Sequence, residues 1–263
     1  MFSIIIPLYN KAAYIEKAIK SVLAQTYQEF ELIVVDDGST VKALQLSTFN
    51  FQLLTQINSG VSTARNNGVA QARYPYICFL DADDWWAPEF LEEMKALIEK
   101  FPKAGIYGTN YYIVKQKNNR IANIGVNSDF ESGEINYCQV YAKTLHMPLC
   151  TGAVCISKAL FDKEQGFKPS LKLGEDFDLW IRIAMKYKVA FLNKALAYYN
   201  QDVDLKGRAV GSKFYLPEEH MLFTDYGDWM LQEDFRYLYE RLALYGLLPY
   251  YLNKKNKLEV DNI

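Results

Sequence analysis

Apolar runs of strand length alternate with helical patterns over about the first 100 residues of the chain. Each run is short and nearly uninterrupted, which is typical of a strand buried on both faces. Between the runs, apolar residues recur about every 3.6 positions, which predicts amphipathic helices. The expected strands cover 3–7, 31–35, 52–57 and 76–80, and the expected helices cover 12–26, 61–72 and 88–101.

Strands that alternate with helices in this way predict βαβ units, in which the strands are parallel and the crossovers right-handed. After Gly105 the pattern becomes less regular. A hairpin is expected from Tyr107–Lys117 and Arg120–Ile124, with its turn at Asn118-Asn119. The other expected elements are a loop over 125–133, helices over 134–145 and from 174 onward, and strands over 151–157, 189–192 and 195–199.

These patterns predict an α/β fold, with a mainly parallel, twisted sheet and flanking helices. We assign residues 1–212 to this domain, with a first half over 1–104 and a second half over 105–212. Residues 213–263 are rich in aromatic side chains and are predicted to form a helical C-terminal extension. Those side chains either pack on the main body or face a membrane surface or a partner.

Composition limits the possible partners of the protein. Half of the 263 residues are hydrophobic, which is enough for a sizeable core. The net charge of -2 argues against binding nucleic acid through overall charge. The four cysteines lie at no metal-binding spacing, and no apolar run is long enough to span a membrane. We therefore expect a cytoplasmic protein, and the aromatic extension leaves open a peripheral contact at the inner face of the cell membrane.

Carboxylates directly follow two of the predicted strands. Asp81, Asp83 and Asp84 come after the run 76–80, and Asp36-Asp37 comes after 31–35. A strand covered on both faces cannot hold carboxylates, so these acids must emerge at its carboxyl end, where open α/β sheets bind ligands. Three adjacent like charges repel unless a cation lies among them, which predicts Mg²⁺ or Mn²⁺. The simpler alternative is that one of the acids caps the next helix.

Three further groups are suited to a nucleotide substrate. Tyr9 follows the first strand and can stack on a base while Asp37 accepts a hydrogen bond from it, although an ordinary turn explains Asp37 equally well. Arg65 lies in the first turns of a predicted helix that follows a glycine, and it can bind an anion or form a surface salt bridge. Glu175-Asp176 also opens a helix, where an acid can act as a general base or complement the helix dipole. The sequence contains neither a dinucleotide-binding glycine motif nor a P-loop, so diphosphate binding would fall to a metal.

Five motifs, taken together and in this order, resemble family 2 of the inverting glycosyltransferases, which have the Rossmann-like GT-A fold. The resemblance covers about residues 1–200 and is to the small, non-processive members, because the transmembrane helices and Gln-x-x-Arg-Trp motif of processive members are absent from the sequence. The motifs are Ile5-Ile-Pro-Leu-Tyr-Asn10, Val35-Asp-Asp-Gly-Ser39, Asn58-x-Gly-x-Ser-x-Ala-Arg-Asn-x-Gly68, Leu80-Asp-Ala-Asp-Asp84 and Gly174-Glu-Asp-Phe-Asp-Leu-Trp180.

The resemblance implies a nucleotide-diphospho-sugar donor, usually a UDP-sugar, together with Mg²⁺ or Mn²⁺ and a glycan or lipid-linked acceptor. Transfer would proceed with inversion at the anomeric carbon. The implied donor-binding residues are Pro7, Tyr9, Asp37, Asn58, Arg65, Asp81 and Arg208, the implied metal ligands are Asp83 and Asp84, and the implied catalytic residues are Asp176, as general base, and its neighbour Glu175.

Two other classes of protein are compatible with parts of this pattern. A nucleotidyltransferase also holds metal with paired acids on an α/β sheet, but it should carry a basic, glycine-rich loop near its N-terminus, which Pro7–Asn10 is not. A catalytically inactive subunit that binds a nucleotide-sugar would keep the same fold. The presence of both Asp83 and Asp176 argues against this second alternative.

Overall fold

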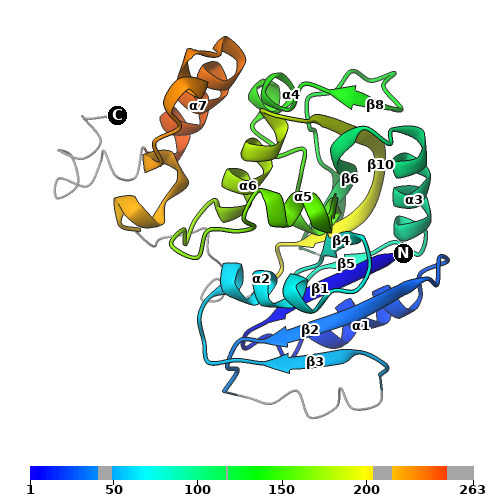
Figure 1. The fold of residues 1–263 in the computed structure, drawn as a ribbon. Helices are drawn as coiled ribbons and strands as arrows, with labels where there is room; N and C mark the ends of the chain where they lie inside the picture. Colours follow the sequence, from blue (N-terminus) through cyan, green and yellow to red (C-terminus); the bar gives the residue numbers. More distant parts are fainter. Residues whose placement is uncertain (41–48, 117, 204–214, 248–263) are drawn as a thin grey trace.

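The computed structural model describes residues 1–40, 49–116, 118–203 and 215–247, and these form a mixed α/β fold around one sheet (Figure 1). The sheet has ten strands, eight of them in the order β3-β2-β1-β4-β9-β6-β10-β5. Strand β7 pairs with β6, and β8 pairs with β10. The predicted α/β architecture with a largely parallel central sheet is therefore confirmed.

The first half of the chain follows the predicted βαβ pattern. Strand β1 pairs in parallel with both β2 and β4, and β2 pairs in parallel with β3. The carboxyl ends of these strands therefore meet at one edge of the sheet. The elements are β1 Phe2–Leu8, α1 Ile15–Leu23, β2 Phe30–Asp36, β3 Gln52–Thr55, α2 Val61–Gln71 and β4 Tyr76–Phe79.

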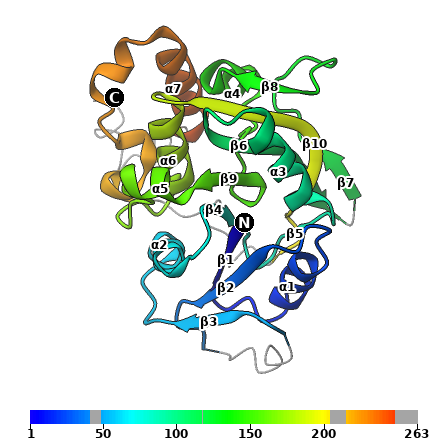
Figure 2. The same cartoon turned by 45° about the vertical axis from the view of Figure 1, so that its right-hand side comes forward.

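Helices cover both faces of the sheet. Alternate residues of its central strands point to opposite faces, so each strand packs against both layers of helices. In β1, Ile4 and Ile6 pack with α1 and with α3 (Phe90–Lys100) on one face. Ile5 of the same strand packs with α2, α5 (Lys158–Lys163) and α6 (Glu175–Ala184) on the other. Figure 2 shows these two helical layers on either side of the sheet. A strand buried on both faces is what the uninterrupted apolar runs predicted.

The second half inserts antiparallel strands into the sheet. Strand β9 lies between β4 and β6 and is antiparallel to both, whereas β6 runs parallel to β10. The antiparallel hairpin of β6 and β7 confirms that prediction. The remaining elements are β5 Trp85–Trp86, β6 Ala104–Lys115, β7 Asn118–Ile121, β8 Ser132–Ile135, α4 Tyr137–Thr144, β9 Val154–Ser157 and β10 Lys188–Asn200.

Several predicted boundaries in this half are wrong. Asn118 pairs with Lys115, so Asn118-Asn119 belong to β7 and the chain reverses before them. Helix α4 begins only after Asn136, whose side chain accepts a hydrogen bond from the amide of Gln139 and caps the helix. The strand expected over 151–157 opens with a 3₁₀ turn, η2 (Thr151–Ala153). The two late strands expected over 189–199 are one strand, β10, with register shifts inside it.

The described part of the C-terminal extension is helical, as predicted, and joins the core. It consists of three short 3₁₀ segments, η4 (Pro217–Glu219), η5 (Met221–Phe223) and η6 (Gly227–Leu231), followed by α7 (Glu233–Gly246). Its buried side chains lie in the same apolar cluster as those of α6. No helix among the residues that the structure describes is long and apolar enough to cross a membrane.

Gly68 lies where α2 packs against the sheet, and it provides a test of this packing. A β-carbon at this position would lie 2.5 Å from Cγ2 of Ile5 and 3.2 Å from Cγ2 of Val35. We expect Gly68→Ala to lower the free energy of unfolding by about 1–3 kcal/mol, because overpacking outweighs the higher helix propensity of alanine. Denaturant unfolding measures the change. Gln71→Ala, at an exposed position of α2, is the control, and equal stability of the two variants would contradict this packing.

Candidate active site

The acidic turn after β4 is joined to the start of α6 by one buried arginine. Arg65 of α2 is only 3% exposed. Its Nη2 donates to Oδ1 of Asp81 at 2.8 Å, and its Nη1 donates to Oε1 of Glu175 at 2.9 Å. The guanidinium carbon also lies 5.1 Å from the centroid of the Phe167 ring. Arg65 therefore connects the acidic turn after β4 to the first turn of α6.

The salt bridges of Arg65 differ from the surface ion pair that was the simpler alternative. The arginine itself is buried, and its two carboxylate partners lie in the turn after β4 and in the first turn of α6. Burial alone lowers the pKa of Arg65, yet the charges of Asp81 and Glu175 outweigh burial and raise it above its usual value. Both terminal nitrogens are bonded to carboxylates, so in this structure Arg65 positions acids and does not present a free guanidinium to an anion.

Glu175 and Asp176 form the first turn of α6. The turn is possible because Gly174, which precedes it, adopts φ 77°, a left-handed conformation that favours glycine. Asp176 is half-buried, and its Oδ2 accepts a hydrogen bond from the Thr151 hydroxyl at 2.9 Å. Burial, with the charge of Asp176 adding to it and Arg65 opposing it, raises the pKa of Glu175 to about 7. The pair therefore combines the Glu175 carboxyl, whose pKa is raised, with the Asp176 carboxyl, which stays partly exposed.

The three acids after β4 diverge instead of converging on one point. Asp81 pairs with Arg65, and Asp83 forms an ion pair with Lys11. Asp84 is buried and accepts a hydrogen bond from the amide of Asn200 at 2.8 Å. Burial, and then the charges of Asp81 and Asp83, raise the pKa of Asp84 well above its usual value. Side-chain cations and a backbone amide thus separate the like charges.

Neither explanation proposed for this acidic turn describes it fully. Across the described ranges, no three His, Cys, Asp or Glu side chains come together in a way that could hold a metal ion, so a three-carboxylate cage is not formed. The helix-capping alternative is wrong, because α3 begins at Phe90 and its N-cap residue is Glu89. The side chain of Asp83 is 16% exposed, and its ion-pair partner, Lys11, has a long, flexible side chain.

At the ends of β1 and β2, Tyr9 and Asp36 reach the surface, and Asp37 turns inward. Tyr9 is 48% exposed. Asp37 is buried, and its carboxylate accepts hydrogen bonds from the amides of Ser59 at 2.7 Å and Gly60 at 2.9 Å. It holds the loop before α2 in place. Asp36 is half-buried, and its Oδ1 accepts from the amide of Ser39 at 2.9 Å.

The other predicted donor-binding residues have different surroundings. The amide nitrogen of the exposed Asn58 side chain donates to the backbone oxygen of Asp37 at 3.0 Å, so Asn58 supports the same loop. Pro7 lies within buried β1, opposite Val35 of β2. Arg208 lies outside the described residues.

A pocket of about 440 Å³ opens beside Asp83. Its walls include Tyr14, directly before α1, Lys17 of α1, Trp85 of β5 and the end of β10. Sequence reasoning did not assign roles to Lys11, Thr151 or Asp36. The only signal for Lys11 was a cation directly after the Tyr9-Asn10 turn, and Thr151 lies too far from Asp176 in sequence to be paired with it by pattern.

The largely parallel sheet with helices on both faces and acids at its carboxyl edge is a GT-A fold, the fold of many glycosyltransferases. Residues 3–162 match the family model described as glycosyl transferase family 2. The chain therefore belongs to glycosyltransferase family 2, as its five motifs indicated.

Relatives and solved structures agree with this assignment. An uncharacterized glycosyltransferase of Rickettsia conorii is 31% identical over 201 residues, which cover 74% of this chain and 32% of the relative. The chain thus spans about a third of the length of that relative. Glycosyltransferase GlyA of Streptococcus pneumoniae is 34% identical over 116 residues, or 42% of this chain and 16% of GlyA. Residues 1–349 of S. aureus TarS, in complex with UDP-GlcNAc, have a similar fold, with a TM-score of 0.77, 21% identity and coverage of 98% of this chain and 77% of that one.

Glu175 should make the stability of the protein depend on pH in a defined direction. Its pKa rises from 4.5 to about 7 on folding, so the unfolded carboxyl loses its proton first as pH increases. The free energy of unfolding should therefore fall between pH 4.5 and about 7, by up to about 3 kcal/mol, and stay low above that range. Glu175→Gln should remove this decline, as measured by urea unfolding at several pH values. Glu99→Gln, at an exposed position, should retain it.

Proposed function

We propose that this chain transfers a sugar from a nucleotide-diphospho-sugar to a hydroxyl group of a glycan or lipid-linked acceptor, with inversion at the anomeric carbon. The observation that carries the proposal is the Arg65 bridge, which brings the acidic turn after β4 next to Glu175 and Asp176. A transferase of this kind needs a site for the diphosphate and a base close to it, and family 2 membership agrees with both.

UDP is the proposed nucleotide of the donor. Structures of TarS, which has a similar fold, were solved in complex with UDP and with UDP-GlcNAc. In this chain the exposed ring of Tyr9 can stack on the base. Asp36 is better suited than Asp37 to accept a hydrogen bond from the base, because the carboxylate of Asp37 is buried and bonded to backbone amides. An N-acetylhexosamine or a hexose is the proposed sugar.

In the proposed mechanism, Asp176 accepts the proton of the acceptor hydroxyl. The resulting oxygen forms a bond to the anomeric carbon while the bond from that carbon to the diphosphate oxygen breaks on the opposite face. An α-linked donor thus yields a β-linked product and the free nucleoside diphosphate. General base catalysis of this kind contributes about 10²–10⁴-fold to the rate. The hydroxyl of Thr151 holds the Asp176 carboxylate in place.

Asp83 is the residue that we propose to hold Mg²⁺ or Mn²⁺. These ions commonly bind one or two carboxylates together with substrate phosphates, so a complete protein cage is not required. Asp83 fits this role because its carboxylate borders the 440 Å³ pocket and its partner is a lysine ammonium. Asp84 fits it less well, since its carboxyl group is buried and its pKa is raised. The metal would supply Lewis-acid stabilisation of the diphosphate leaving group.

Asp176→Asn tests the base. The variant should bind UDP within about twofold of the parent protein in calorimetry but should transfer sugar about 10²–10⁴-fold more slowly, because it cannot take up the proton. Transfer is measured as UDP released from a UDP-sugar in the presence of acceptor. Asp162→Asn, at an exposed acid of α5, should transfer at the parent rate. Near-parental transfer by Asp176→Asn would show that another group is the base.

Variants of Lys11 and Asp83 test the metal site through Mn²⁺ and UDP binding, without a transfer reaction. In donor-free protein, Lys11→Met should bind Mn²⁺ about tenfold more tightly, because the ammonium no longer competes for the carboxylate. Asp83→Asn should lose the increase in UDP affinity that Mn²⁺ produces. Both are measured by isothermal titration. Lys20→Met, at an exposed lysine on α1, is the control. Mn²⁺-enhanced UDP binding that survives in Asp83→Asn would exclude Asp83 as the ligand.

A further inference from the structure

The loop that carries the proposed catalytic acids is paired along its backbone with the C-terminal extension. The amides of Lys172 and Leu173 donate to the carbonyl of Glu219 at 2.7 and 3.1 Å, and the amide of Met221 donates to the carbonyl of Leu173 at 3.1 Å. Leu173 and His220 form a parallel β-bridge. This pairing ends immediately before Glu175, so it reaches the N-terminus of α6.

Side-chain packing continues the contact at Gly174. A β-carbon at Gly174 would lie only 2.2 Å from Cγ of Met221, so the methionine occupies the space next to the glycine. In the first turn of α6, the ring of Phe177 meets the ring of Tyr226 edge to face, with centroids 6.4 Å apart. The extension therefore contacts the chain on both sides of Glu175-Asp176.

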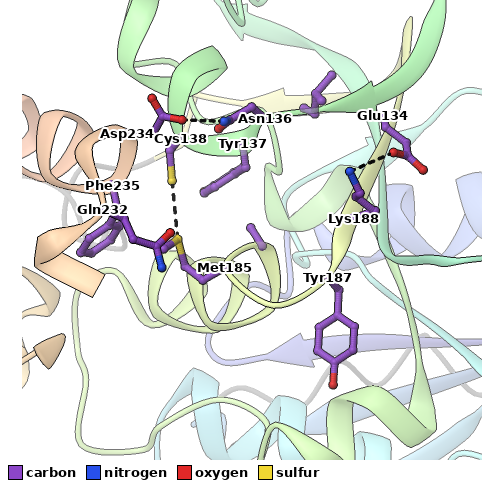
Figure 3. A pocket seen from close by; sticks show the side chains of 12 residues that line it. Glu134, Asn136, Tyr137, Cys138, Met185, Tyr187, Lys188, Gln232, Asp234 and Phe235 are labelled. Carbon is purple, nitrogen blue, oxygen red and sulfur yellow. Dashed lines mark hydrogen bonds and ion pairs between the residues drawn. The ribbon is translucent and has the colours of Figure 1, made fainter. Parts of the chain in front are cut away.

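The extension is itself anchored to the body away from the acids. Within the extension, Leu222 is buried, and its carbonyl accepts a hydrogen bond from the hydroxyl of Tyr239 in α7. At the start of α7, the carboxylate of Asp234 accepts hydrogen bonds from Asn136 at 2.8 Å and from Gln139 at 3.0 Å. Figure 3 shows Asp234 beside Asn136 among the residues that line a pocket of about 370 Å³ between α4, α6 and α7. Segment 219–222 is thus held between α7 and the catalytic loop.

We propose that residues 217–246, here called the C-terminal clamp, position Asp176 for catalysis. The inference rests on the proposed function and adds a role for a segment outside the family match, which ends at residue 162. The clamp holds the loop from residue 172 to Gly174, and that loop sets where α6 begins. The residues proposed to hold the nucleotide lie on other elements, at the ends of β1 and β2. Loosening the clamp should therefore slow transfer and leave donor binding intact.

A purely structural role for the extension makes a different prediction. If residues 217–246 only cover apolar surface, loosening them should lower the melting temperature, with the apparent kcat following the fraction of folded protein and KM unchanged. A positioning role predicts a selective fall in kcat in protein that is still folded, because a displacement of about 1 Å in a catalytic group can cost 10²-fold in rate.

The first test uses the contact between Gly174 and Met221. Gly174→Ala should reduce kcat at least about tenfold, with KM for the donor changed less than about twofold, because the new methyl group displaces the loop from the clamp. Adding Met221→Ala removes the Cγ atom that clashes most and leaves the β-carbon of residue 221, 2.9 Å away, so it should raise kcat at least about threefold above that of Gly174→Ala. The backbone strain of alanine at a positive φ remains in the double variant, so full recovery is not expected. Absence of any recovery would overturn the coupling between clamp and loop.

The second test acts at a distance from the acids. Tyr239→Phe removes the hydroxyl bonded to Leu222, and Tyr245→Phe, at an exposed tyrosine of the same helix, is the matched control. In Tyr239→Phe, hydrogen–deuterium exchange of peptides covering 172–177 should be faster than in the control, and kcat should fall severalfold. Unchanged exchange in these peptides together with unchanged kcat would refute the proposal.

The two readouts separate failure of this inference from failure of the proposed function. Exchange rates and UDP affinity are measured without any transfer reaction. If exchange increases as expected but neither parent nor variant releases UDP from any UDP-sugar, the clamp holds the loop and the proposed transferase activity is wrong. If the parent transfers sugar and the clamp variants keep its kcat, the transferase stands and the clamp does not position Asp176.

Discussion

The site depends on how a buried positive charge is compensated. Arg65 is almost inaccessible to water, and a buried charge is tolerated only when it is paired and hydrogen-bonded. Its two partners, Asp81 and Glu175, come from parts of the chain that are remote in sequence. Removing the arginine would leave two carboxylates facing each other near Asp176. The ion pairs therefore fix the geometry of the acids more than they stabilise the fold, and a bidentate guanidinium is the side chain best suited to hold them.

The same reasoning explains why the acids after β4 do not converge. Three carboxylates in one turn need compensation, and the protein supplies it separately, through Arg65 for Asp81, through Lys11 for Asp83 and through a backbone amide for Asp84. Of these partners, only Lys11 has a single flexible ammonium that can leave easily. Asp83 is thus the carboxylate that we propose to exchange its partner for an incoming cation. The charges of one short turn take on different roles because their surroundings differ.

The C-terminal extension changes how the second half of the fold is understood. Among its described aromatic residues, Tyr226, Phe235 and Tyr239 lie in the same core as α6, whereas Tyr237 and Tyr245 are exposed. Since the extension also pairs with the backbone before Glu175, the start of α6 is held from outside as well as by Arg65. Gly174 marks this junction, because Met221 fills the space that any larger residue would need.

The sequence alone determined the βαβ order, the parallel sheet and the acids at its edge, because uninterrupted apolar runs and helical periodicity are local properties. It also indicated the family, through five motifs whose order survives without coordinates. Local pattern could not place β5 or the continuous β10, whose residues are strands because of their neighbours in the sheet. Nor could it distinguish the roles of Asp36 and Asp37, pair Lys11 with Asp83, or bring Thr151 to Asp176. Only the tertiary structure decided these points, since each depends on which distant groups are buried together.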